Sequence, residues 1–304
     1  MQHWHILGAG AIGGLFANLL QTAGTPCTLL LRTDDPDLAV GTAALTLRRG
    51  DQQQTCRFSV SASSDNIPIS HLLVCTKAQD IVAAIAGVAH RLAPGAVVVL
   101  LANGMGYQQQ VRARWPQLDC FSGSTTEGAF REGRRAICHA GQGSTLIGQP
   151  GRVAAPDWFR TWLALPARCA WSADIDTVLW RKLAINCAIN PVTALHRCRN
   201  GELAQRPQLA ALVGELCAEI SAIGIAAGQQ RAVSNLRQQV MAVIAATADN
   251  RSSMLQDVLA GRATEIDYLT GYLLARGREH GVPAPRNAAL LAAVQAVHAD
   301  NLGA

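Results

Sequence analysis

The residues with the clearest chemical potential lie in the second half of the chain, within 179–191. Lys182 and Asn186 are four residues apart and Asn190 follows one turn later, so a helix places them on one stripe. Their neighbours are apolar, and an ammonium and two amides are costly to bury there without a polar partner. A merely solvated stripe would have polar neighbours. The spacing therefore predicts a functional site, and Pro191 predicts that the helix ends at Asn190.

A second motif, G-x-G-x-x-G, directly follows a short apolar run at the start of the chain. Gly8 permits a tight turn, Gly10 lets a pyrophosphate approach the backbone, and Gly13 allows close packing of helix and strand. A glycine-rich turn alone is a weak signal, but here strand, helix and second strand occupy the required places. We therefore predict a bound dinucleotide. The loop residues expected to hold it are Gly8, Ala9, Gly10, Ala11, Ile12 and Gly13.

The end of the second expected strand distinguishes between the two nicotinamide cofactors. An acidic residue near this point would hold the ribose 2′-hydroxyl of NAD, but the strand ends in Leu31-Arg32. Arg32 can pair with a 2′-phosphate and stack on adenine, which favours NADPH over NADH. Asp34 and Asp35 follow closely and would serve NAD if the strand ended later. We predict NADPH.

Other polar residues have both a functional and a purely structural interpretation. Lys77 and Asn103 follow apolar runs, and ligands of open parallel sheets bind outside the carboxyl ends of the strands. Asn103-Gly104 is also a common turn sequence. Further along, Ser252 or Ser253 is suited to cap a helix, and Glu265 is suited to the first turn of one.

Together these motifs resemble the ketopantoate reductase family. They occur in the family's order and extend from about residue 1 to about residue 290. Besides the glycine loop, the matching segments are 103–104, 125–129, 181–186, 190–191, 200–203, 252–257 and 264–267. The segments in the helical half are far more specific than the glycine loop, which many dinucleotide-binding proteins share.

The resemblance implies NADPH-dependent reduction of ketopantoate to pantoate in pantothenate and coenzyme A biosynthesis. It implies that Lys182 is the general acid that protonates the carbonyl oxygen. The residues it implies for substrate binding are Lys182, Asn186, Asn190, Asn200, Asn250, Ser253 and Glu265. Those it implies along the cofactor site, besides the glycine loop, are Arg32, Lys77, Asn103, Ala129 and Glu265.

The elements that must position these residues change character along the chain. Short strand-like runs alternate with helical ones in the first half, and 45–59 has the pattern of a hairpin around Gly50-Asp51. From about residue 175 onwards the sequence is rich in Ala, Leu, Gln and Arg, with almost no strand-like alternation. We predict an α/β chain with an N-terminal Rossmann-type domain over 1–172 and an all-helical substrate domain over 173–304.

Composition excludes several classes of protein. With 49% hydrophobic and 15% charged residues, the chain of 304 residues is not intrinsically disordered. The formal net charge of +5 is mild, and no basic arm or basic–aromatic stretch indicates nucleic-acid binding. No apolar run approaches the ~18 residues of a membrane span. The nine cysteines include no C-x-x-C pair, which favours reduced thiols, no metal site and a cytoplasmic location.

Two other functions are compatible with parts of this pattern. A related enzyme acting on another 2-keto acid, or a β-hydroxyacid dehydrogenase, would also combine a Rossmann domain, a helical domain and a lysine. A regulator that senses NADP without turnover would keep the glycine loop but has no need to align Lys182, Asn186 and Asn190. The expected partner is thus a small-molecule substrate, with neither nucleic acid nor membrane, and we expect a monomer or homodimer.

Overall fold

The computed structural model describes residues 2–302 of the chain, with side chains described for 2–297. Its contacts divide the chain into two compact units. The sheet unit comprises Met1–Ala102 and Tyr107–Ile175, and the helical unit comprises Asn103–Gly106 and Asp176–Ala304. A four-residue segment of the first half thus belongs to the helical unit, which the sequence did not indicate.

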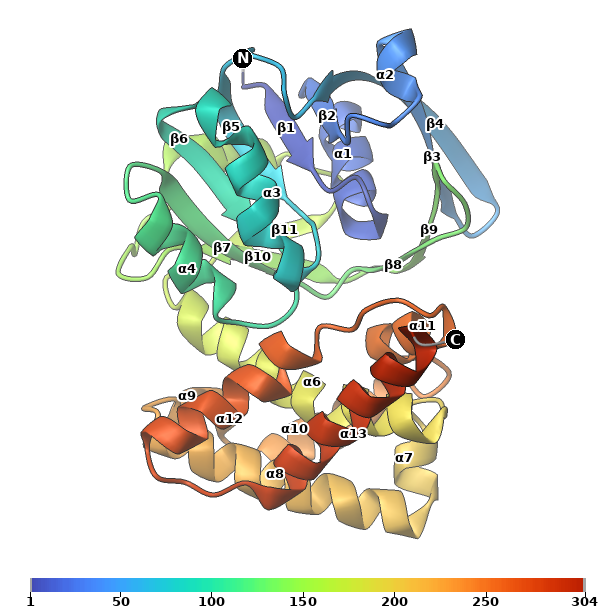
Figure 1. Ribbon diagram of the computed structural model, residues 1–304, viewed down its shortest axis with the longest axis vertical. Coiled ribbons are helices and arrows are strands. Elements are labelled where there is room, and N and C mark those ends of the chain that lie inside the picture. The colour runs from blue at the N-terminus through green and yellow to red at the C-terminus, as the bar shows by residue number, and fades with distance from the viewer. Residues whose placement is uncertain (1, 303–304) are drawn as a thin grey trace. The chain divides into compact units, whose positions relative to one another are not determined.

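The sheet unit is built on parallel strands (Figure 1). The central strands are β1 (Trp4–Leu7), β2 (Cys27–Leu31), β5 (Ile69–Val74), β6 (Leu92–Leu100) and β7 (Asp119–Thr125). Most of them are apolar along much of their length, β7 being the more polar exception. Ile6 of β1 pairs with Leu29 of β2 and with Leu73 of β5, which fixes the register. Continuous apolar runs suit a sheet buried on both faces. The predicted α/β fold class is confirmed.

Six further strands extend the sheet to eleven, in the order β11-β10-β7-β6-β5-β1-β2-β4-β3-β9-β8. They are β3 (Thr42–Arg49), β4 (Gln52–Ala62), β8 (Gly128–Arg131), β9 (Ala136–Gly141), β10 (Ser144–Gly148) and β11 (Arg168–Trp171). β3 and β4 are antiparallel and turn at Gly50, whose φ of +57° suits glycine, so the predicted hairpin is confirmed. β8 and β11 were not predicted from the sequence.

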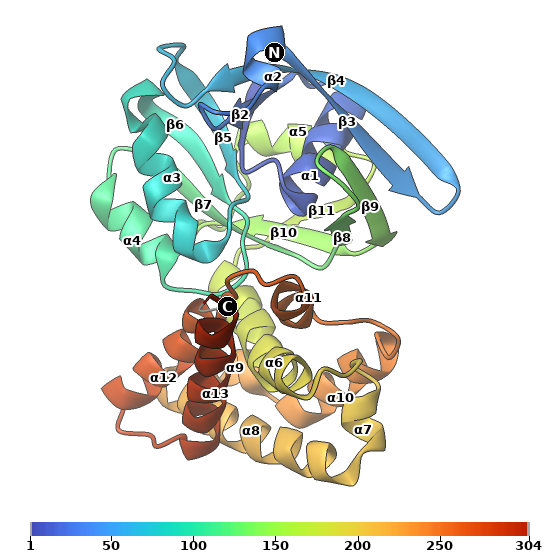
Figure 2. The same ribbon diagram turned by 45° about the vertical axis from the view of Figure 1, so that its right-hand side comes forward.

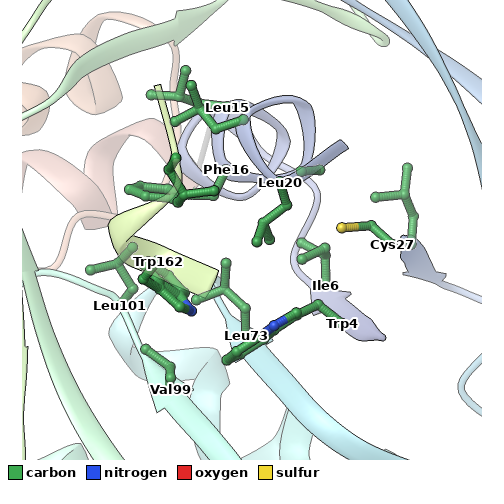
Figure 3. Packing of buried hydrophobic residues seen from close by; sticks show 14 of the residues in the cluster. Trp4, Ile6, Leu15, Phe16, Leu20, Cys27, Leu73, Val99, Leu101 and Trp162 are labelled. Carbon is green, nitrogen blue, oxygen red and sulfur yellow. The ribbon is translucent and has the colours of Figure 1, made fainter. Parts of the chain in front are cut away.

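Aliphatic and aromatic side chains together fill the core on one face of the sheet (Figure 3). Helices α1 (Ala11–Thr22) and α5 (Arg160–Leu163) meet there, with ring centroids of Phe16 and Trp162 5.3 Å apart. Trp4 of β1 lies against Trp162 edge to face at 5.6 Å, and all three rings are fully buried. Helices α3 (Ile81–Val88) and α4 (Tyr107–Arg114) cover the opposite face (Figure 1), while α2 (Asp37–Val40) follows β2. This packing anchors the start of α1, which the glycine loop precedes.

The helical unit contains α6 to α13 (Figure 2). Their bounds are α6 (Ile175–His196), α7 (Glu202–Gln205), α8 (Pro207–Ala226), α9 (Gln230–Val233), α10 (Leu236–Ala246), α11 (Ser253–Leu259), α12 (Thr270–Glu279) and α13 (Pro285–Leu302). The predicted helix end at Asn190 is wrong, because α6 continues through Pro191 to His196. A proline inside a helix costs about 3 kcal/mol. Full burial of Ala188, Val192 and Thr193 on the flanking turns offsets that cost.

Helix α8 bears on the expectation that no apolar run reaches the length of a membrane span. An 18-residue window of this 20-residue helix has a mean hydropathy of 1.8, so the helix is long and apolar enough for a membrane span by length and composition alone. Its side chains Leu216, Ile220 and Ile223 are nevertheless fully buried in the unit. Glu219 on the same helix accepts hydrogen bonds from the backbone and side chain of Asn287 in α13, at 3.0 and 2.8 Å. These contacts pack one part of α8 inside the unit.

Candidate functional site

The glycine loop of the sheet unit has the geometry that its sequence requires. Gly8 has a φ of +93°, and a Cβ there would lie 2.6 Å from the backbone nitrogen of Thr76. A Cβ on Gly13 would lie 2.1 Å from the carbonyl oxygen of Gly8. Gly10 instead faces open space, because a Cβ there would have no atom of the described chain within 4 Å beyond its own neighbours. The loop therefore offers an approachable backbone at the start of the twelve-residue helix α1, which suits a pyrophosphate.

The other expected cofactor residues of the sheet unit lie at strand ends. Arg32 follows β2 directly and its side chain is exposed. Lys77 lies three residues beyond the end of β5 and is half-buried. Ala129 lies in β8, paired with His139 of β9. Asp35, the alternative ribose ligand, is already engaged by Arg135, whose Nη2 lies 2.9 Å from both of its carboxylate oxygens.

Lys182 occupies the first half of α6 in the helical unit. Burial lowers the pKa of its ammonium from 10.5 to about 8, while the nearby carboxylate of Glu265 opposes that shift. Glu265 directly precedes the short 3₁₀ turn Ile266–Tyr268. A lysine with a pKa near neutrality beside a carboxylate is suited to proton transfer.

Asn103 lies beside Glu265, within the helical unit. Its Nδ2 donates a hydrogen bond to Glu265 Oε2 at 3.1 Å. The segment that carries it is attached to the same turn, because the Met105 N–H donates to the carbonyl oxygen of Tyr268 at 2.8 Å. Gly104 makes this possible with a φ of +81°, since a Cβ there would lie 2.5 Å from that same carbonyl oxygen. The structure thus brings together Lys182, Glu265 and Asn103.

The two asparagines that follow Lys182 at helical spacing also lie in α6. Asn186 is half-buried and Asn190 is 7% exposed. One turn beyond, the Thr193 hydroxyl donates to Ser252 Oγ at 2.7 Å, and Ser252 Oγ accepts the Leu255 N–H at 3.1 Å as the cap of α11. The capping interpretation is therefore correct for Ser252. Ser253, the expected substrate ligand, is the exposed first residue of α11.

Asn200 and Asn250 are joined through the backbone, since the Asn200 N–H donates to the Asn250 carbonyl oxygen at 3.0 Å. The Asn200 side chain is 7% exposed and its Nδ2 donates to Thr247 Oγ1 at 2.9 Å. Its Oδ1 is buried and makes no hydrogen bond to the described part of the chain. The Asn250 side chain is exposed. Two asparagines expected to bind substrate are thus adjacent in space.

Two residues of this arrangement escaped the sequence interpretation. Thr193 connects α6 to the cap of α11, and Thr247 orients the Asn200 amide. The first contact spans 59 residues and the second 47, so no local spacing indicates either. In the helical unit, then, an ammonium, a carboxylate and several amides are held by named partners, which suits an anionic, carbonyl-bearing ligand. Among the described residues no group of three His, Cys, Asp or Glu could hold a metal ion.

Both halves of the chain match models of one protein family. Residues 4–152 match Ketopantoate reductase PanE/ApbA, and residues 174–298 match Ketopantoate reductase PanE/ApbA C terminal. The chain is 35% identical to 2-dehydropantoate 2-reductase of Yersinia pestis over 298 residues, which cover 97% of this chain and 95% of the relative. The match to 2-dehydropantoate 2-reductase of Shigella flexneri is 37% identical, covering 95% and 93%.

Solved structures agree on the fold. A probable 2-dehydropantoate 2-reductase from Bacillus subtilis superposes with a TM-score of 0.83 at 26% identity, covering 97% of this chain and all of the other. A D-mandelate dehydrogenase in complex with NADH and anilino(oxo)acetate superposes with a TM-score of 0.90 at 20% identity, covering 99% of each chain. At that identity the second likeness concerns the fold alone.

Proposed function

Because the chain belongs to the ketopantoate reductase family, we propose that it reduces 2-dehydropantoate (ketopantoate) to pantoate with NADPH. This reaction would serve pantothenate and coenzyme A biosynthesis, with the enzyme acting in the cytoplasm as a monomer or homodimer. The observation that carries the proposal is Lys182, whose pKa of about 8 suits a proton donor, beside Glu265. The family match over both halves of the chain supports the choice of substrate.

The fit of the cofactor rests on the glycine loop. The open space at Gly10 leaves room for a pyrophosphate against the start of α1. The absence of a side chain at Gly13 lets the start of this helix pack closely against the Gly8 turn. Bound NADPH supplies the hydride for the ketone carbon. The exposed guanidinium of Arg32 is available for the 2′-phosphate, and bidentate pairing with phosphate is a property of arginine. The remaining residues of the proposed cofactor site are Lys77, Asn103, Ala129 and Glu265.

Lys182 acts as the general acid in this proposal. As the ketone is reduced, negative charge develops on its oxygen, and the Lys182 ammonium stabilises that charge and then donates a proton from Nζ. Such a group contributes about 10²–10⁴-fold to the rate. Glu265 favours the charged form of Lys182, and the hydrogen bond from Asn103 holds the Glu265 carboxylate. An arginine would not replace the lysine, because it does not give up a proton.

The amides and hydroxyls of the helical unit bind the rest of the substrate in this proposal. Amide N–H groups donate to a carboxylate, and their oxygens accept from a hydroxyl. The Asn200 amide, which Thr247 Oγ1 orients, is one of these groups. The remaining residues assigned to substrate binding are Asn186, Asn190, Asn250 and Ser253.

The test is NADPH oxidation at 340 nm against ketopantoate, ketoisovalerate and pyruvate. We expect ketopantoate to give the highest kcat/KM, and Lys182→Ala to lower kcat at least about 10²-fold with NADPH affinity retained. Arg181→Ala is the matched control, because Arg181 is the exposed neighbour on the same helix. Preference for another keto acid would overturn the substrate assignment, and binding of NADPH without any turnover would indicate a sensor.

A further inference from the structure

An ion-pair cluster of the sheet unit joins the loop after β2 to the turn between β8 and β9. Arg135 Nη2 lies 2.9 Å from Asp35 Oδ2, and its Nε lies 2.7 Å from Asp37 Oδ2. Arg134 Nη2 lies 2.5 Å from Asp35 Oδ1. The side chains of Asp35 and Arg135 are only 19% and 20% exposed, so solvent screens their pair incompletely. The two partners are 100 residues apart in the chain.

The cluster occupies the Asp35 carboxylate. Oδ1 accepts from both arginines and from the Asp37 backbone N–H at 3.1 Å, and Oδ2 accepts from Arg135. Partial burial would raise the pKa of Asp35, but the Asp37 N–H and the two guanidinium groups outweigh it and lower that pKa. A carboxylate with these partners is a poor acceptor for a further hydroxyl.

The same cluster holds the turn that presents Arg32. The Asp35 N–H donates to the Arg32 carbonyl oxygen at 3.0 Å, so these two residues close one turn at the end of β2. On the other side, the Arg135 carbonyl oxygen accepts the N–H of Thr46 in β3 at 2.8 Å. Arg135 is therefore anchored to the sheet at its backbone and to the loop at its side chain.

The charges of this ion-pair cluster affect which dinucleotide can bind beside Arg32. The segment 32–37 carries three aspartates and one arginine, a net charge of −2, and Arg134 and Arg135 bring the cluster to neutrality. An unpaired aspartate at the end of β2 would accept a hydrogen bond from a ribose 2′-hydroxyl and would repel a 2′-phosphate. The arginines of the β8–β9 turn remove both effects.

We propose that Arg135, assisted by Arg134, is a positioning residue that makes this chain select a 2′-phosphorylated dinucleotide by sequestering Asp35 and Asp37. This inference rests on the proposed use of NADPH and assigns part of that selectivity to a turn about 100 residues away in sequence from Arg32. Arg135 acts through Asp35 and has no assigned contact with the cofactor.

The experiment compares Arg135→Gln with the unaltered enzyme. Calorimetry with adenosine 2′,5′-bisphosphate and adenosine 5′-monophosphate measures the adenosine half alone, and kcat/KM with NADPH and NADH measures turnover. We expect the preference for the 2′-phosphorylated member of each pair to fall at least about tenfold, the size of one charge interaction at a partly exposed site. Arg160→Gln removes an equivalent charge from the exposed pair with Asp157 and should leave both ratios unchanged.

Asp35→Asn provides the second arm. Added to Arg135→Gln it should restore the preference, because residue 35 then carries no charge and Arg134, 3.7 Å from the Asp37 carboxylate, still pairs with it. Alone, it should retain the preference for the 2′-phosphate in a protein that keeps its ion-pairing arginines. Unchanged ratios in Arg135→Gln, failure of the double variant to restore them, or loss of bisphosphate binding in Asp35→Asn would each overturn the inference.

These outcomes are separable from failure of the proposed function. An unaltered enzyme that prefers NADH would refute the proposed cofactor and this inference together. An unaltered enzyme that prefers NADPH, combined with an unchanged ratio in folded Arg135→Gln, would refute only the role of Arg135. Thermal melting establishes whether that variant is folded, and loss of bisphosphate binding in Asp35→Asn would overturn the inference even where it is not.

Discussion

The pKa of Lys182 yields a quantitative prediction for the pH dependence of catalysis. At a pKa of about 8, about 90% of this lysine is protonated at pH 7 and about 10% at pH 9. If the ammonium is the general acid, kcat/KM for ketopantoate should fall about tenfold between these pH values, because kcat/KM reports the free enzyme's essential groups. A lysine at the ordinary value of 10.5 would remain about 97% protonated at pH 9.

Replacing Glu265 should shift the pH range over which kcat/KM falls, the alkaline limb of the pH profile, in a defined direction. The Glu265 carboxylate raises the pKa of Lys182 against the larger effect of burial. Glu265→Gln should therefore shift the midpoint of the limb to lower pH, whatever it does to the maximal rate. Glu215→Gln is the matched control, since Glu215 lies in the same unit and pairs with Arg286.

The assay is kcat/KM from initial rates of NADPH oxidation between pH 6 and pH 10, with cofactor saturating and ketopantoate varied. A profile that stays level to pH 9.5 would refute the assignment of Lys182 as the acid. A shift of the limb to higher pH in Glu265→Gln would refute the coupling of the two residues.

Three further predictions concern stability and binding. Lys182→Met should raise the free energy of unfolding at pH 7 by on the order of 1–3 kcal/mol. The reason is that the pKa of Lys182 is about 8 in the folded state and 10.5 in the unfolded state, so the folded state disfavours the ammonium. Differential scanning calorimetry should show this gain in stability fading as the pH rises from 8 to 10.5. Gly10→Ala should leave the melting temperature unchanged and weaken NADPH binding, whereas Gly13→Ala should destabilise the fold, since its Cβ meets a backbone oxygen at 2.1 Å; equal melting temperatures would contradict this. Ser252→Ala should cost about 1 kcal/mol in chemical denaturation through loss of the α11 cap, while Ser253→Ala should raise KM for ketopantoate without that cost.

Local patterns in the sequence were sufficient for most of the fold. The glycine loop, the apolar runs of the parallel strands and the turn at Gly50 each depend on residues close in sequence. Pro191 misled because its local preference for ending a helix is outweighed by burial on the flanking turns, which the sequence does not display. β8 was missed because a strand of four residues at the edge of a sheet carries little periodicity.

The candidate site likewise combines residues that local sequence patterns predict with residues that only contacts distant in sequence bring together. The Lys182 stripe follows from helical spacing, and the capping serine follows from residue type. Asn103, by contrast, follows a strand of the sheet unit, and contacts distant in sequence, such as its 3.1 Å hydrogen bond to Glu265 across 162 residues, show which unit it belongs to. The pairing of Asp35 with Arg135 is likewise invisible to any local pattern.

The segment Asn103–Gly106 has a practical consequence for dissecting the protein. Because it belongs to the helical unit while its flanking residues belong to the sheet unit, the chain passes between units after residues 102, 106 and 175. A fragment beginning near residue 173 would lack the partner of the Tyr268 carbonyl oxygen and the amide that holds Glu265. Neither half can therefore be expressed complete by a single cut, and a self-sufficient helical fragment needs residues 103–106 grafted onto it.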